Sequence, residues 1–184
     1  MTRKPSKGII FLLAVGISLQ GLDLFSPAQG AVAQGQTAKA ALVTARAVAK
    51  QWQADAVPFQ IAALGAREDG TAIPEFGWAF FFHSAKANNT YSIQTPNGQP
   101  TGFEGGPHFT RAIPDDFIDS DRVMAEAKKN GFKAQGKFGM LLAVVSDVNL
   151  NHGLYWYVVE DKLDGARFYV DPKTGKFLGK RGGK

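Results

Sequence analysis

The feature that most constrains the fold is an order of elements that occurs twice along the chain. Residues 37–54 carry apolar side chains at helical spacing, and three short apolar or aromatic segments follow, each bounded by Gly, Pro, Asn or Asp. The same order returns in the second half. Trp78 and Trp156 occupy matching aromatic segments, 156 − 78 = 78 positions apart, and Pro96 and Pro172 occupy matching turns, 172 − 96 = 76 positions apart. This nearly constant offset predicts an internal duplication, with a chance likeness of two aromatic strands as the alternative.

The connections between the strand-like segments are short, which favours antiparallel pairing. One helix beside several such strands is typical of an α+β layer, in which the helix covers one face of the sheet. The predicted fold is therefore α+β, built of two αβββ halves at residues 34–110 and 111–184 that share one sheet or pack in tandem. Residues 75–85 are apolar on both faces of the expected strand, which predicts a central position covered on both sides.

Residues 1–33 have the order of a secretory signal. Basic residues come first, an apolar run follows at residues 8–19, and small residues precede Ala33. The run is shorter than the roughly 20 residues that span a bilayer, so we expect cleavage after Ala33 rather than a retained membrane anchor. The chain contains 0 Cys, which excludes a lipobox and any disulfide framework. We expect an exported protein, periplasmic or secreted, with no membrane span after processing.

Few residues have the spacing of a reactive site. His83, His108 and His152 show no metal-ligand spacing, so we expect aromatic packing for His83 in a strand and exposed loop positions for the other two. The acidic residues at 115–121 are interpreted as the start of a helix rather than a calcium site. No nucleophile elbow, phosphate loop or dinucleotide fingerprint is present. We predict no catalytic residue, metal or cofactor, and export argues against a nucleic-acid partner.

The stretch Asp171–Gly175 has residue types that also occur in reactive loops. Asp171 suits the first position of a turn, Pro172 presets φ at the next, and Gly175 can supply a positive φ. We predict a hairpin turn with a bulge.

The second half resembles the PepSY family over about Asp119 to Gly179. "SDRVMAEAKKNGF" is followed by "LYWYVVEDKLDGARFYVDPKTGKFLG", the family's Ala- and Lys-rich helix, aromatic strand and Asp-Pro-x-Thr-Gly turn. The first half is only loosely similar, with Thr95 to Gly98 in place of that turn. The resemblance implies an exported PepSY/cystatin-like module that modulates peptidases outside the cytoplasm, and it brings no catalytic residues. The residues that carry it are Trp156, Tyr157, Val158, Tyr169, Val170, Asp171, Pro172, Thr174 and Gly175.

The aromatic residues supply the candidate binding site. One hypothesis is a non-catalytic module that binds a peptide or an envelope peptidase through an exposed sheet face or an edge strand. The alternative is a small-ligand carrier with an aromatic cavity between helices and sheet. An enzyme would require the histidines to meet carboxylates in one cleft. The candidate ligand- or partner-binding residues are Trp52, Trp78, Phe82, Tyr155, Trp156 and Tyr169, of which the tryptophans and Phe82 would line the carrier's cavity.

Overall fold

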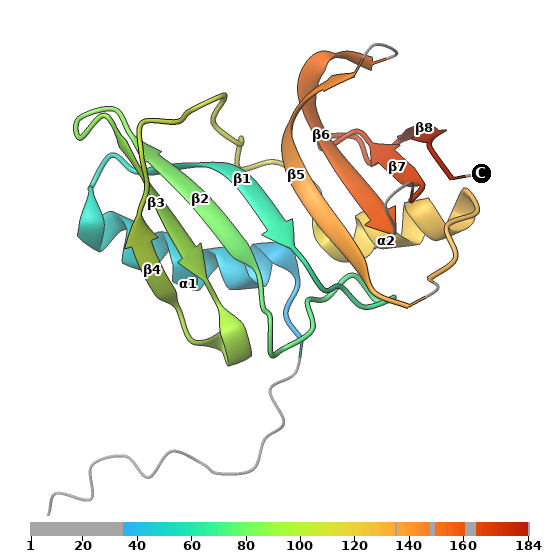
Figure 1. Ribbon diagram of the computed structural model, residues 1–184, viewed down its shortest axis with the longest axis horizontal. Coiled ribbons are helices and arrows are strands. Elements are labelled where there is room, and N and C mark those ends of the chain that lie inside the picture. The colour runs from blue at the N-terminus through green and yellow to red at the C-terminus, as the bar shows by residue number, and fades with distance from the viewer. Residues whose placement is uncertain (1–34, 135, 148–149, 161–164, 184) are drawn as a thin grey trace, which may run out of the picture. The chain divides into compact units, whose positions relative to one another are not determined.

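The computed structural model describes residues 35–134, 136–147, 150–160 and 165–183, which belong to one compact unit. The fold is α+β, as predicted, with helices α1 and α2 against an antiparallel sheet (Figure 1). The signal predicted at residues 1–33 lies outside the described residues. In chain order the elements are α1 (Ala38–Trp52), β1 (Val57–Ala63), β2 (Ala79–Ser84), β3 (Asn89–Gln94), the 3₁₀ turn η1 (Pro96–Gly98), β4 (Thr101–Glu104), α2 (Ser120–Lys129), β5 (Phe138–Asp147), β6 (Leu150–Glu160), β7 (Arg167–Val170) and β8 (Phe177–Arg181).

The strands form one sheet in the order β4-β3-β2-β1-β5-β6-β7-β8, and every neighbouring pair is antiparallel. β1 and β5 pair at the centre, where Ile61 lies opposite Leu142. The two stretches of chain therefore share a sheet, and tandem packing is wrong.

The predicted αβββ composition is also wrong, because each stretch adds a fourth strand. β4 lies in the Gly- and Pro-rich stretch expected to separate the two halves, and β8 follows the predicted hairpin turn but was not counted among the three strands of its half. β4 has only the four residues Thr-Gly-Phe-Glu, all exposed, and β8 alternates half-buried with exposed residues around Gly179. Neither segment has the run of alternating apolar residues from which a strand is predicted.

The helices lie on the same face of the sheet (Figure 1): α1 contacts β2 and β3, and α2 contacts β6 and β7. Leu42, Ala45 and Ala49 form the buried stripe of α1. Thr37 caps α1 by accepting a hydrogen bond from the backbone of Ala40. Asp119, which lies in the acidic stretch predicted to start a helix, caps α2.

The amino-terminal ends of the two helices are joined by hydrogen bonds. The N–H of Ala38 donates to Oγ of Ser120 at 3.0 Å, and the N–H of Lys39 donates to Oδ1 of Asp119 at 2.9 Å. The same Oδ1 accepts from the backbone of Ser120 at 2.8 Å. One aspartate therefore satisfies free donors of two helices, and its negative charge lies where both helix dipoles are positive.

One tryptophan forms a hydrogen bond to the backbone just before each helix. Nε1–H of Trp78 donates to the carbonyl of Gln36 at 2.7 Å, and Nε1–H of Trp156 donates to the carbonyl of Ile118 at 3.0 Å. Gln36 and Ile118 each directly precede the capping residue of a helix. The indoles pack edge to face with ring centroids 6.2 Å apart, at the centre of the core.

The turn between β7 and β8 is a hairpin turn, as predicted. Oδ1 of Asp171 accepts from the backbone of Lys173 and from the backbone and hydroxyl of Thr174. Gly175 has φ +75°, and a bulge follows in the β7–β8 pairing. Burial opposes ionisation of Asp171, but the hydrogen bonds from Thr174 and Lys173 outweigh it and hold the pKa of this carboxyl below its usual value.

The hydrogen bonds that the indoles donate predict a large loss of unfolding free energy for Trp156→Phe. The substitution leaves the carbonyl of Ile118 without its donor and opens space beside a fully buried ring, so we expect a loss of about 2–4 kcal/mol in unfolding free energy. Trp52→Phe is the matched control, because Trp52 is half-exposed, and it should cost less than about 1 kcal/mol. Urea unfolding followed by circular dichroism compares the variants, and similar losses would contradict the assigned role.

The turn predicts a pH-dependent contribution from Asp171. A carboxyl with a lowered pKa stabilises the fold above its unfolded value of about 3.8 and loses that contribution as the pH falls through the folded value. Asp171→Asn keeps the side-chain acceptor but does not ionise, so its stability difference from the unsubstituted protein should shrink between pH 6 and pH 3. Asp171→Ala should cost on the order of 1 kcal/mol at neutral pH. A pH-independent difference for Asp171→Asn in urea unfolding would contradict the assignment.

Candidate functional site

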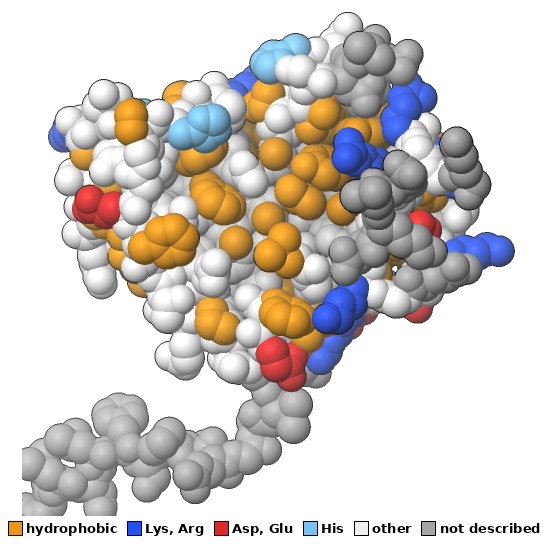
Figure 2. Space-filling view, in the orientation of Figure 1, with side chains coloured by type: hydrophobic (Ala, Val, Ile, Leu, Met, Phe, Trp, Pro, Cys, Tyr) orange, Lys and Arg blue, Asp and Glu red, His pale blue; other side chains and the backbone are white. Residues whose placement is uncertain are grey.

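The candidate site is the sheet face opposite the helices, called the open face below. Side chains alternate along each strand, so Phe80 and Phe82 of β2 point to the helices while Phe81 points to the open face. No described helix covers this face, and Figure 2, which views it directly, shows apolar side chains gathered over its centre. Small or aliphatic side chains lie in the middle, with aromatic rings on both sides of them. The central strands contribute Ala62, Ala79, Phe81, Leu141, Ala143, Tyr155, Tyr157 and Tyr169.

This arrangement corrects the expectation that β2 is covered on both sides. Only its helix-facing residues are buried, and Ala79, Phe81 and His83 are half-buried. Both faces of β2 are apolar, yet only one belongs to the core. The second apolar face is therefore available for contacts outside the fold.

The open face has an exposed apolar rim. The exposed fraction is 79% for Leu64, 50% for Phe76 and 56% for Phe103. Leu64 and Phe76 line a cavity of about 150 Å³ whose wall includes Ala62 and Ala79. Large side chains are exposed together here, and such clusters mark interaction surfaces on soluble proteins.

Three tyrosines form the opposite side of the open face. The ring of Tyr169 lies 6.4 Å from that of Tyr155 and 5.7 Å from that of Tyr157, measured between centroids. Burial raises the pKa of Tyr157, and the nearby charge of Arg167 acts in the opposite direction. Tyr157 therefore stays neutral near neutral pH and presents an apolar ring with a hydroxyl group.

The connector between β4 and α2 lies over the other end of the face. Phe109 stacks on His83 with ring centroids 4.4 Å apart, so the predicted aromatic packing of His83 is confirmed. Phe59 contacts both Phe109 and His108. His152 is exposed as expected, but it lies in β6 and not in a loop. Among the described residues, no group of three or more His, Asp or Glu side chains is placed to hold a metal ion.

The six predicted binding residues are divided between two faces. Trp78, Phe82 and Trp156 are buried in the core on the helix side. Trp52 is half-exposed on α1 and stacks on Tyr91 of β3 at 5.1 Å. Only Tyr155 and Tyr169 point to the open face, where Tyr155 is half-buried and Tyr169 is buried, with 2% of its surface exposed. The prediction therefore missed Leu64, Phe76 and Phe103, because isolated apolar residues in turns and short strands give no periodic signal in the sequence.

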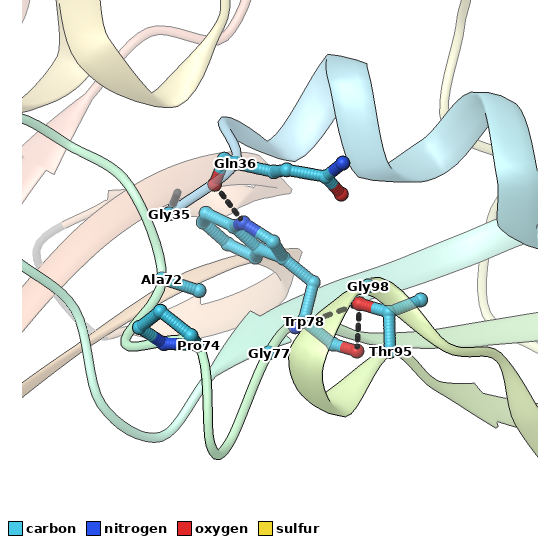
Figure 3. Close-up of a pocket in the computed structure, with 8 residues that line it drawn as sticks. All are labelled: Gly35, Gln36, Ala72, Pro74, Gly77, Trp78, Thr95 and Gly98. Atoms are coloured by element: carbon cyan, nitrogen blue, oxygen red, sulfur yellow. Dashed lines mark hydrogen bonds between the residues drawn. The ribbon is translucent and has the colours of Figure 1, made fainter. Parts of the chain in front are cut away.

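The cavity beside Trp78 is too small for an organic ligand. It has a volume of about 20 Å³ and lies between the segment Gly35–Gln36 and the turn that contains Thr95 (Figure 3). The hydroxyl of Thr95 accepts from the backbone N–H of Trp78 and donates to its carbonyl. A space of this size holds about one water molecule, so this is a structural cavity.

Two further cavities lie on the helix side, of about 280 and 180 Å³. Both are bounded by Arg46 of α1 and Asp115 of the connector, which form an ion pair between them. The two cavities therefore meet at this ion pair.

The edges of the sheet are the remaining candidate surfaces. All residues of β4 are exposed, and its pairing with β3 is regular. β8 carries Lys180 and Arg181 and pairs irregularly with β7. Charges and irregular pairing on an edge strand discourage the addition of another strand, so β4 is the more accessible edge.

Comparisons with known proteins give a fold likeness. No family model matches the chain, and no curated protein does. The crystal structure of a protein from Clostridium difficile 630, described as a "putative lipoprotein", is similar with a TM-score of 0.51. The two chains are 15% identical, and the likeness covers 76% of this chain and 91% of that one. At this identity the similarity shows a common fold only. None of the described helices is long and apolar enough to cross a membrane.

The exposed rim predicts dye binding by the folded protein. Anilinonaphthalene sulfonate fluoresces on apolar surfaces, so the native protein should enhance its emission, and Phe76→Ser and Leu64→Ser should reduce the enhancement. Because both side chains are exposed, unfolding free energy should change by less than about 1 kcal/mol. Leu178→Ser, on β8 and 37% exposed, is the control that should leave dye binding unchanged. Equal loss in all variants would show that the rim is not a distinct surface.

Proposed function

We propose that this chain is an exported, non-catalytic binding module that holds an extended segment of a protein partner on or beside the open face. The main support is an apolar sheet face with an exposed apolar rim and no described helix over it. Extended segments suit such a surface because alternate side chains enter it while the backbone pairs with an edge strand. The resemblance to the PepSY family adds the partner class, an envelope or secreted peptidase whose activity the module modulates.

Export is part of the proposal and rests on the signal pattern of residues 1–33. Cleavage after Ala33 would leave intact the segment that begins the described structure. The carbonyl of Gln36 accepts from Nε1–H of Trp78 and from the backbone of Ala72, which ties this segment to the core. After cleavage, the amino-terminal segment of the mature chain would therefore still be hydrogen-bonded to the core.

We also propose that the two stretches of chain arose by duplication. The strand order is symmetric about the β1–β5 pair: outward from this pair, β1 to β4 follow one another on one side and β5 to β8 on the other. Trp78 and Trp156 make the same hydrogen bond to the residue before a helix cap. These correspondences support the proposal more directly than the sequence offset does.

The carrier hypothesis has less support. Trp78, Phe82 and Trp156 pack in the core. The cavities of about 280 and 180 Å³ on the helix side and of about 150 Å³ on the open face are below the roughly 300–1,000 Å³ typical of ligand pockets. The binding module is therefore favoured.

A panel of envelope and secreted peptidases tests the proposal. Residues 34–184 should form a complex with at least one of them and change its rate of peptide hydrolysis, measured by size-exclusion chromatography and a fluorogenic assay. Phe76→Glu places a charge in the apolar rim and should weaken that complex about tenfold or more.

Val43→Glu is the matched control on the helix side and should have no effect, because Val43 is exposed away from the open face. No complex and no altered activity across the panel would refute the peptidase proposal. Equal weakening by the two variants would refute the role of the open face.

A further inference from the structure

β4 and β8 differ in how an added strand would meet them, although both are edge strands. On β8, Lys180 and Arg181 carry charge, and Lys180 lies over the ring of Phe168 with Nζ 5.4 Å from its centroid. On β4 the only charged residue is Glu104, the pairing with β3 is regular, and Phe103 is 56% exposed. Lys residues and bulges protect natural edge strands from pairing, so β8 is protected and β4 is not.

The backbone of β4 has free groups at two positions. The N–H of Gly105 donates to the carbonyl of Thr90, and these residues continue the β3–β4 register. Hydrogen-bonded pairs alternate along an antiparallel ladder, so Phe103 bonds to β3 while Gly102 and Glu104 direct their N–H and C=O groups outward. An antiparallel strand could pair with both residues, and its intervening residue would then lie opposite Phe103.

The side chains around β4 indicate which side chains an added strand should have. Phe103 points to the open face, on the side of Phe81, because it pairs with Ser92. Glu104 points to the helix side, where Oε1 accepts from Nε1–H of Trp52, and it makes no ion pair with a described residue. A cation opposite Glu104 would also lie near the stacked rings of Trp52 and Tyr91.

We infer that β4 adds an antiparallel strand from a partner polypeptide, with a basic side chain opposite Glu104 and an apolar side chain opposite Phe103. The inference rests on the proposed function and names the edge and the peptide chemistry. Two charges of opposite sign and two apolar side chains would then face each other across the new pair. Because β4 is four residues long, recognition is confined to a short extended segment.

The probes are two labelled heptapeptides that differ at one position. The first has lysine, valine and threonine as its central residues, and the second has glutamate in place of lysine. Fluorescence anisotropy with residues 34–184 should give a dissociation constant about fivefold lower for the lysine peptide.

Amide hydrogen exchange locates the site. Bound lysine peptide should slow exchange at Gly102 and Glu104, whose N–H groups point outward. Exchange at Phe103 should change little, because its N–H already bonds to β3.

Two variants separate the contribution of the Glu104 charge from that of the Phe103 side chain, and a third is the control. Glu104→Gln keeps an acceptor for Trp52 and removes the charge, so the preference for lysine should disappear. Phe103→Ser should weaken both peptides about tenfold. Leu178→Ser on β8 is the matched control and should leave binding unchanged.

The outcomes distinguish this inference from the proposed function. A peptide that protects only the amides of β5 and β6 would keep the open face as the site and overturn the role of β4. Protection of Gly102 that rises with protein concentration in the absence of peptide would mean that a second copy pairs there, and would also overturn it. Lack of peptide binding would overturn the inference even if a peptidase complex forms through Phe76.

Discussion

The fold depends on the place where the two helices begin. Each helix amino terminus has free N–H groups, and burying two of them side by side would be unfavourable without acceptors. Asp119 and Ser120 supply those acceptors to α1 as well as to α2. The carbonyls just before the caps are bonded by the indoles of Trp78 and Trp156. Helices, sheet and core are therefore fixed relative to each other around a few buried or partly buried hydrogen bonds.

This junction determines which sheet face remains open. With both helices held on one side, the large side chains of β2 and β6 that point toward them are buried, and those that point away are half-buried. The connector residues His108 and Phe109 cover one end, but the centre of the open face has only neighbouring side chains beside it. The open face is thus a consequence of the helix arrangement and not of an unusual composition.

Local sequence patterns predict much of the fold, but they predict the candidate site less well. The helices at 37–54 and from 119 were predicted within a few residues, because caps and apolar spacing are local signals. β4 was missed because it has four residues and no alternation of apolar side chains, and β8 was not counted as a strand although it follows the predicted hairpin turn. The faces of the aromatic strands could not be assigned, since Phe81 and Phe82 have the same chemistry and only the helices distinguish them. The predicted repeat did contain a usable signal: a tryptophan at matching positions in both stretches is consistent with the buried, hydrogen-bonded positions of Trp78 and Trp156.

The symmetric strand order has a consequence for stoichiometry. A sheet with this order has two ends at equivalent positions, and if both accepted a strand, one molecule would join two partners and build chains of them. Lys180, Arg181 and the irregular pairing at β8 leave one end suited to pairing. The difference between the two ends would make the protein monovalent, a unit that occupies its partner without cross-linking it.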